Sequence, residues 1–264
     1  CAGASRDYLA ILDNFCWSSS DTPERLYQLK EAARACHDIA VAYGTPFISG
    51  KDSMFNNFRG FDAAGKNVDI AALPTLLISA IGVMPDISKA VTIDFKREGD
   101  AVYLIGETND ELGASEYFTM LGEKSGTVPV VDAKNNAETY DALSNAIQKD
   151  LVASAIGVGR GGLAVALAKS AIAGKLGAQV NLANVAGNAK QSDSILFSES
   201  QGRMLVSVSH TSQKEFEKLF KSVPLTNLGE IVQADPVSIM LPETKVDLGL
   251  SALTESYRSF FNNW

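Results

Sequence analysis

A lysine and two serines lie within one five-residue segment, Ser49-Gly50-Lys51-Asp52-Ser53. An ammonium, hydroxyls and backbone N–H groups beside a glycine are donors that bind phosphate. The apolar residues before the segment predict a short strand over Pro46–Ile48 that leads into a polar turn. The spacing differs from that of a Walker A loop, because five residues separate Gly44 from Gly50 and an aspartate follows Lys51. Two interpretations stay open: a phosphate-binding turn, and an ordinary turn with a surface lysine.

A second glycine-rich segment, Gly157-Val158-Gly159-Arg160-Gly161-Gly162, matches the pattern G-x-G-x-x-G. It lies between a predicted strand, Leu151–Ile156, and a predicted helix, Leu163–Ala173. A dinucleotide-binding loop also needs an acidic residue about 20 positions further on, at the end of the next strand. The next predicted strand, Gln179–Leu182, is followed by Asn184. We interpret the segment as a tight turn that packs the helix against its sheet, with a dinucleotide site as the alternative.

Three polar side chains in Ser198-Glu199-Ser200 precede a predicted strand over Met204–Val208. Hydroxyl and carboxylate groups at a strand entry can hold a ligand, and they are equally typical of a turn. The sequence does not decide between these two interpretations.

The cysteines and histidines predict neither a metal site nor a nucleophile. Cys1, Cys16 and Cys36 lack the spacing of metal ligands or of a disulfide framework. We expect Cys16 and Cys36 to pack among apolar side chains, His37 to lie on a helix surface and His210 in a turn. Free cysteines are typical of a reducing compartment, so a cytoplasmic location is expected.

The composition excludes several classes of protein. The chain has 264 residues, 46% hydrophobic and 20% charged, with a formal net charge of −8. An acidic chain has no basic surplus to neutralise phosphates, so nucleic-acid and anionic-membrane binding are not expected. The longest apolar run, Ile70–Met84, is interrupted by Pro74 and too short to span a bilayer. No signal peptide is expected, and a start at Cys1 favours a piece of a longer chain.

Strand and helix patterns alternate without strict βαβ regularity, which predicts an α+β or α/β fold in two domains. A strand over Tyr8–Leu12 precedes a helix that carries Leu26 and ends at Gly44. The polar stretch Asn56–Asn67 is expected to form a mobile loop, and Leu73–Met84 a buried strand. A turn at Arg97-Glu98-Gly99-Asp100 marks the expected boundary between domains at 1–96 and 97–264. A closing helix is predicted over Leu253–Phe261.

Four segments, taken in order, resemble phosphoribosylformylglycinamidine synthase. They are Leu12-Asp13-Asn14-Phe15-Cys16-Trp17, Gly44-Thr45-Pro46-Phe47-Ile48-Ser49-Gly50-Lys51-Asp52-Ser53-Met54, Pro74-Thr75-Leu76-Leu77-Ile78-Ser79-Ala80-Ile81-Gly82 and Leu196-Phe197-Ser198-Glu199-Ser200-Gln201. The likeness extends to about Leu250 and is greatest to the second of two homologous halves of the synthetase. It implies a truncated N-terminal sheet domain and a C-terminal α/β domain, both as in aminoimidazole ribonucleotide synthetase.

The resemblance also implies an activity. The family converts formylglycinamide ribonucleotide, ATP and glutamine-derived ammonia into formylglycinamidine ribonucleotide in purine biosynthesis, with Mg²⁺ as a cofactor. It places ATP contacts on Asp13, Gly50 and Lys51 and a substrate contact on Ser53. Many members have a magnesium-ligating asparagine at the position of Lys51. Because an ammonium cannot ligate a metal, we expect Lys51 to meet phosphate directly, and we assign no metal ligand and no catalytic residue here.

The implied partners are the first half of the synthetase and a glutaminase domain or subunit. The family usually has His-Asp-x-Ser-Asp/Glu-Gly-Gly-Leu where this chain has Ile156 to Leu163, so acidic character is lost and Arg160 replaces a carboxylate. We therefore expect the chain to be inactive alone and to complete a composite site. The alternative is a structural pseudo-domain that only supports the catalytic half. The truncated sheet would leave an open edge, which makes self-association possible.

Overall fold

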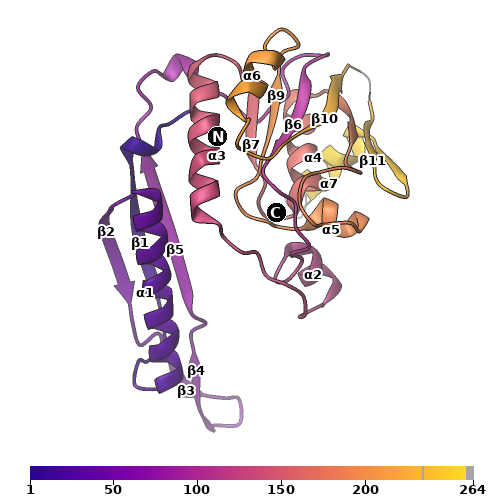
Figure 1. Cartoon of the computed structure of the whole chain (residues 1–264). Coiled ribbons are helices and arrows are strands. Elements are labelled where there is room, and N and C mark those ends of the chain that lie inside the picture. Colours follow the sequence, from indigo (N-terminus) through magenta and orange to yellow (C-terminus); the bar gives the residue numbers. More distant parts are fainter. Residues whose placement is uncertain (234, 260–264) are drawn as a thin grey trace. The chain divides into compact units, whose positions relative to one another are not determined.

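The computed structural model describes residues 1–233 and 235–259 and separates into two compact units (Figure 1). The N-terminal unit comprises Ala4–Pro85, and the C-terminal unit comprises Cys1–Gly3 with Asp86–Trp264. Both mix helices with sheets, as the sequence predicts. The structural division falls at Pro85, and the domain ranges 1–96 and 97–264 stay a prediction.

The N-terminal unit combines one long helix, a three-stranded sheet and a hairpin. After the 3₁₀ turn η1 (Arg6–Tyr8), its elements are β1 (Leu9–Cys16), α1 (Pro23–Tyr43), β2 (Phe47–Ser53), β3 (Asn57–Phe61), β4 (Asn67–Ala71) and β5 (Thr75–Gly82). The strand order is β2-β1-β5, with β2 parallel and β5 antiparallel to β1. Strand β2 is therefore an edge strand, and β3 and β4 pair separately as an antiparallel hairpin.

Helix α1 begins with Pro23 in its first turn and ends at Gly44, which adopts a left-handed φ of 66°. Glycine reaches this conformation without the steric cost of a Cβ atom, so it is a favoured helix terminator. The side chain of Trp17 connects the helix to the sheet, because its Nε1 donates to the carbonyl of Arg25 at 3.1 Å. Phe15 and Trp17 are 7% and 4% exposed, and their ring centroids lie 6.0 Å apart. These aromatic residues form the centre of a small core.

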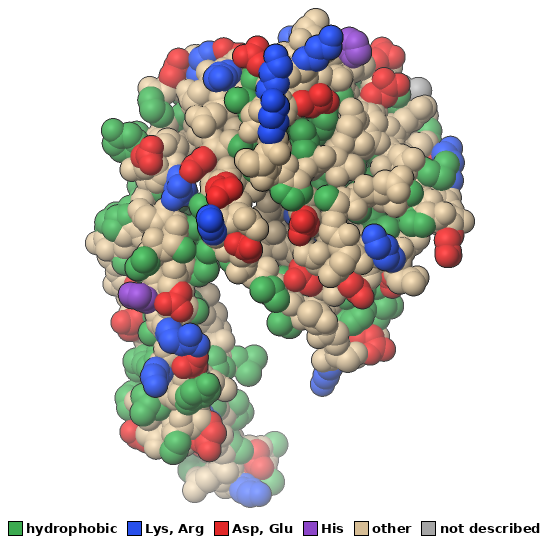
Figure 2. Space-filling model, in the orientation of Figure 1, with side chains coloured by type: hydrophobic (Ala, Val, Ile, Leu, Met, Phe, Trp, Pro, Cys, Tyr) green, Lys and Arg blue, Asp and Glu red, His purple; other side chains and the backbone are tan. Residues whose placement is uncertain are grey.

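Two expectations for this unit are wrong. The polar stretch from Asn56 to Asn67 is not a loop throughout, because it supplies β3 and the turn of the β3–β4 hairpin. Asp62 closes that turn by accepting hydrogen bonds from the N–H groups of Ala64 and Lys66, both at 2.9 Å. Strand β5 forms as predicted but is not buried, since Leu77 and Ile81 are each 58% exposed. Apolar side chains lie among charged ones over this unit (Figure 2).

The C-terminal unit is built on a seven-stranded sheet. Its strands are β6 (Ala101–Ile105), β7 (Ser154–Gly157), β8 (Gly177–Asn181), β9 (Met204–Val208), β10 (Leu225–Val232), β11 (Val237–Met240) and β12 (Lys245–Leu248). Its helices are η2 (Ile87–Lys89), α2 (Glu116–Leu121), α3 (Ala133–Gln148), α4 (Gly162–Gly174), α5 (Ser192–Phe197), α6 (Gln213–Leu219) and α7 (Leu250–Ser259). The strand order is β12-β11-β8-β10-β6-β9-β7. Phe260 and Phe261, the last residue of the predicted closing helix, lie outside the described residues.

Two hydrophobic cores lie on the two faces of this sheet. Val102 and Leu104 of β6 pack with α4 residues such as Leu167, whereas Tyr103 and its same-face neighbours pack with α3 and with Phe216 of α6. All five residues of β6 are buried because successive side chains point to opposite, covered faces. No helix in the described part of the chain is long and apolar enough to cross a membrane.

Candidate functional site

The four residues assigned to ATP and substrate lie on the paired strands β1 and β2. In their parallel register Asp13 lies beside Gly50, Asn14 beside Lys51 and Cys16 beside Ser53. The predicted polar turn is absent, because β2 continues from Phe47 through Ser53. The sequence suggested a turn because the segment is short, polar and glycine-containing, but pairing with β1 extends it. These side chains are therefore presented by a strand at the edge of a sheet.

Asp13 and Gly50 share the face of the sheet that α1 covers. Directly paired residues point to the same face, and successive residues alternate. Burial and, secondarily, the negative charge of Asp13 raise the pKa of the Cys36 thiol, which belongs to α1. The carboxylate thus lies on the helix side of the sheet, near Cys36. This face also carries the buried ring of Phe15.

The carboxylate of Asp13 occupies the space above Gly50. A Cβ atom added to Gly50 would lie 1.9 Å from Oδ1 of Asp13 and 2.9 Å from its Cγ. Both distances are far below a van der Waals contact, so any side chain at position 50 displaces the carboxylate. Gly50 is not in the left-handed region of backbone conformation, so the close approach to Asp13 is what requires a glycine here.

Lys51 and Ser53 point to the opposite, uncovered face. They lie in adjacent same-face rows, Lys51 with Asn14 and Leu77, and Ser53 with Cys16 and Thr75. Lys51 is exposed, and its side chain forms no hydrogen bond or ion pair with the described residues. A mobile ammonium beside an amide and a hydroxyl is a suitable arrangement of donors for a phosphate group.

Cys16 belongs to this uncovered face and is half-buried. Nδ2 of Asn56 lies 3.2 Å from its sulfur and donates to the carbonyl of Ser53 at 2.9 Å. Asn56 thus fixes the end of β2 and places a polar amide group next to the Cys16 sulfur. The expectation of purely apolar surroundings for Cys16 is wrong in this respect.

The residues around Lys51 do not fit a magnesium ion by themselves. Mg²⁺ prefers near-octahedral oxygen ligands, usually including carboxylates, but the ammonium of Lys51 lies on this face and Asp13 lies on the other. In the described part of the chain no group of three or more His, Cys, Asp or Glu residues is arranged to hold a metal ion. We therefore derive no chemical step through a metal on this chain.

The Ser198-Glu199-Ser200 segment holds three loops of the C-terminal unit together. Glu199 Oε1 accepts hydrogen bonds from the N–H groups of Glu116 and Gly161, at 2.9 and 2.8 Å. The Oγ atoms of Ser198 and Ser200 accept from backbone N–H groups of the loop after β6, at 3.2 and 3.0 Å. Each of the three polar side chains therefore accepts hydrogen bonds from the protein's own backbone. This supports the interpretation of the segment as a turn over its interpretation as a ligand-binding site.

The glycine-rich segment before α4 does not form a dinucleotide site. The carboxylate of Glu199 already accepts from the Gly161 N–H, and Arg160 forms an ion pair with Glu116. Strand β7, which precedes the segment, is an edge strand antiparallel to β9. A Rossmann fold instead places its loop after a parallel strand. At Gly162 an added Cβ would lie 2.5 Å from the carbonyl oxygen of Leu196, so the segment packs tightly against its neighbours.

Arg203 is an interior residue that the sequence analysis missed. It is 2% exposed and donates to the carbonyls of Ser200 and Ser198 at 3.0 and 2.5 Å and to Thr108 Oγ1 at 3.0 Å. Burial lowers the pKa of its guanidinium to about 10, against the opposing effect of nearby carboxylates. A single arginine after a turn gives no signal of burial in the sequence, because arginine is usually exposed.

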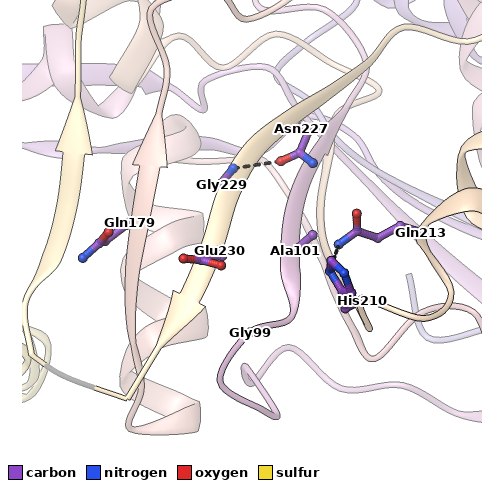
Figure 3. A pocket seen from close by; sticks show the side chains of 8 residues that line it. All are labelled: Gly99, Ala101, Gln179, His210, Gln213, Asn227, Gly229 and Glu230. Carbon is purple, nitrogen blue, oxygen red and sulfur yellow. Dashed lines mark hydrogen bonds between the residues drawn. The ribbon is translucent and has the colours of Figure 1, made fainter.

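A polar cavity of about 380 Å³ lies on the seven-stranded sheet (Figure 3). Its lining residues are Gly99, Ala101, Gln179, His210, Gln213, Asn227, Gly229 and Glu230. His210 and Gln213 lie on one side of it and Gln179 on the other, with Glu230 between them. Asn227 turns back to its own strand, since its Oδ1 accepts from the Gly229 N–H at 3.0 Å. No residue assigned to ATP or substrate lines this cavity.

The fold agrees with the comparisons with known proteins. Residues 97–241 match the family described as AIR synthase related protein, C-terminal domain. The chain belongs to this AIR synthase-related family.

Its similarity to particular relatives extends over almost the whole chain. It is 33% identical to the phosphoribosylformylglycinamidine synthase subunit PurL of Deinococcus radiodurans over 257 residues, which cover 95% of this chain and 33% of that protein. The PurL subunit of Methanocaldococcus jannaschii is 31% identical over 247 residues, 90% of this chain and 33% of that protein. The chain thus spans about a third of the length of these relatives.

Solved structures share the fold. Thermotoga maritima PurL complexed with FGAR superposes with a TM-score of 0.69 at 20% identity, over 96% of this chain and 40% of that one. The hydrogenase maturation protein HypE in complex with ATP superposes with a TM-score of 0.67 at 14% identity, over 94% of this chain and 74% of that one. At these identities the likeness establishes the architecture alone.

Proposed function

We propose that this chain contributes the β1–β2 strand pair to the composite active site of a phosphoribosylformylglycinamidine synthase. In that enzyme ATP drives the amidation of formylglycinamide ribonucleotide with ammonia from glutamine. The similarity to PurL subunits and the FGAR and ATP complexes of Thermotoga maritima PurL support this class of reaction. The observation that carries the proposal is the close fit of Asp13 over Gly50, beside an edge strand that presents Lys51 and Ser53.

We assign each residue a role that fits its face of the sheet. Lys51 binds a phosphate oxygen of ATP, because its ammonium is exposed on the uncovered face, and Ser53 binds the ribonucleotide from the same face. Asp13 accepts a hydrogen bond from ATP, and Gly50 keeps the space in which that carboxylate lies. Asp13 and Lys51 point to opposite faces of the sheet. A single nucleotide that contacts both side chains must therefore extend around the sheet edge that β2 forms. None of these residues transfers a proton or forms a covalent bond.

The partners proposed are the first half of the synthetase and a glutaminase domain or subunit, in line with the name of the solved PurLQS assembly of Thermotoga maritima. We propose that Mg²⁺ of the complete enzyme is held by residues outside this chain, since the lysine at position 51 cannot ligate it. The chain alone is then inactive. Three free cysteines favour a cytoplasmic location. The domain ranges 1–96 and 97–264 remain part of this proposal.

The test is substitution of Lys51 in a complete synthase that carries this segment. Lys51→Ala is expected to lower turnover about tenfold or more, because it removes a charge-assisted contact to phosphate. Lys66→Ala is the matched control, since Lys66 is an exposed lysine in the β3–β4 turn. Unchanged kinetics in Lys51→Ala would contradict the proposed contact between Lys51 and ATP. Ser53→Ala should raise KM for the ribonucleotide with little change in kcat.

A second candidate function, a structural pseudo-domain, is favoured by the Ser198-Glu199-Ser200 segment. Its three side chains are engaged in holding loops, and Arg160 pairs with Glu116 at the glycine-rich segment. If both Lys51→Ala and Ser53→Ala leave the kinetics of the complete enzyme unchanged, the pseudo-domain is the better description.

A further inference from the structure

A second cavity of the C-terminal unit, of about 540 Å³, lies near the start of β6. It is lined by Lys96, Arg97, Asp100, Asp150, Leu151, Val152, Ala153 and Ser209. Gly99 and Ala101 line the cavity of Figure 3, so consecutive residues of this segment border two different cavities. The residues proposed to contact ATP and the ribonucleotide are absent from both linings.

Asp100 is the unusual member of this lining. Its side chain is only 4% exposed, and its Oδ2 atom is buried without a hydrogen-bond partner among the described residues. A buried carboxylate oxygen without a donor costs free energy that a ligand's donor would recover. Burial raises the pKa of Asp100, and the charge of Arg97 opposes that effect. Because this oxygen has almost no accessible surface, a ligand's N–H or ammonium group would satisfy it once the carboxylate turns toward the cavity.

Arg97 supplies an opposite charge that is also unengaged. Its charge acts on Asp100, yet no ion pair joins the two side chains, and the guanidinium forms no hydrogen bond within the described part of the chain. The other charged lining residues are occupied, because Lys96 pairs with Asp94 and Asp150 pairs with Lys89. Among the described residues, the cavity therefore has one anion and one cation that are near each other and have no partner of opposite charge.

We infer that this cavity binds the α-amino and α-carboxylate groups of a small amino acid, with the ammonium on Asp100 and the carboxylate on Arg97. An α-amino acid carries both charges on adjacent carbon atoms, which matches two opposite charges that do not reach each other. Leu151, Val152 and Ala153 provide an apolar wall for a short aliphatic side chain. A simple anion would meet Asp100, and a simple cation would meet Arg97, so neither fits as well.

The test is titration of the purified chain with L-alanine, followed by backbone amide NMR shifts and calorimetry. Saturable binding in the millimolar range is expected, with shifts confined to the residues that line the cavity. Asp100→Asn and Arg97→Gln should each weaken the affinity about tenfold, since each removes one charged partner. Glu98→Gln is the matched control, because Glu98 is an exposed acid between them that lines neither cavity, and it should leave affinity unchanged.

Asp100→Asn removes a buried charge, so it should fold at least as well as the parent, which circular dichroism checks. Methylammonium and acetate are the half-ligand probes, and both should bind much more weakly than L-alanine. Absence of saturable L-alanine binding overturns the inference, as does equal binding by Asp100→Asn. Methylammonium binding as tight as that of L-alanine also overturns it, because the cavity would then be a simple cation site.

Discussion

The two units bury their sheets to very different extents. In the C-terminal unit both faces of β6 are covered, and its five residues are all buried. In the N-terminal unit only the α1 side of the sheet holds a core, centred on Phe15 and Trp17, while Leu77 and Ile81 remain 58% exposed. Burial of apolar surface is the main source of folding free energy. The C-terminal unit thus buries enough apolar surface to fold as an independent domain. The N-terminal sheet instead leaves one apolar face exposed, and this face could bind another protein surface.

The largest effect is expected from Arg203 in the better-packed unit. Arg203→Met leaves the carbonyls of Ser198 and Ser200 and the hydroxyl of Thr108 without their donor in the interior. Each such group costs about 1–3 kcal/mol, so a loss of about 3 kcal/mol or more is expected. Chemical denaturation measures it, and hydrogen exchange should localise it to the C-terminal unit. A loss below about 1 kcal/mol would contradict the proposed network.

The second prediction concerns the close fit in the N-terminal unit. Gly50→Ala should displace the carboxylate of Asp13, because the new Cβ would lie 1.9 Å from its Oδ1. The cost in stability is expected to be only about 1 kcal/mol, since an aspartate side chain can rotate away. ATP binding by the complete synthase should fall much more. In an Asp13→Ala background the stability cost of Gly50→Ala should vanish, and additive effects in this double-mutant cycle would refute the contact.

A third prediction tests the exposed face of the N-terminal sheet. Ile81→Lys should weaken self-association of the isolated chain severalfold, because a charge on the apolar face opposes its burial. Sedimentation velocity over a range of concentrations measures the change. Met240→Lys is the matched control, since Met240 is a 43% exposed apolar residue of the C-terminal unit. A chain that is monomeric throughout, or an equal effect of the control, would show that this face does not mediate association.

The smallest effect is a pH dependence from Asp94. Its hydrogen bonds with Lys96 and Thr92 hold the pKa of the carboxyl below its ordinary value. A carboxyl with a lowered pKa stabilises the fold above its unfolded value of about 4, and that stabilisation is lost as the pH falls through the folded pKa. Asp94→Asn should therefore lower stability by about 0.5 kcal/mol near neutral pH, given partial solvent exposure. The difference from the parent should disappear in acid, as urea denaturation at several pH values would reveal.

Local signals made part of this fold predictable. Helix α1 follows from its apolar spacing and from Gly44, and the apolar run of β6 is a strand in any arrangement. The β3–β4 hairpin was missed because its short strands mix polar and apolar residues and its turn depends on the side chain of Asp62. Strand pairing decided the conformation of Gly50 to Ser53, and pairing with a distant segment leaves no local trace in the sequence.

The resemblance proposes which residues make up the candidate site, but the sequence does not give their geometry. The resemblance assigned Asp13, Gly50, Lys51 and Ser53, and the β1–β2 register places them side by side. The separation of Asp13 and Lys51 onto opposite faces depends on the register, and the fit of Asp13 over Gly50 depends on side-chain placement. The burial of Arg203 and the unpartnered Oδ2 atom of Asp100 could not be predicted from the sequence, because burial of a charged residue depends on tertiary packing.

Three loops meet at Ser198-Glu199-Ser200, and this limits the use of such a segment as a sequence marker of enzymatic activity. Ser198 and Ser200 hold the loop after β6, and Glu199 joins the start of α2 to the glycine-rich segment, so the fold itself depends on these side chains. A mutational scan would find the segment intolerant even in a chain without catalysis. Its presence in a genome sequence therefore reports a correctly built domain, and evidence of activity has to be sought on the strand that carries Lys51.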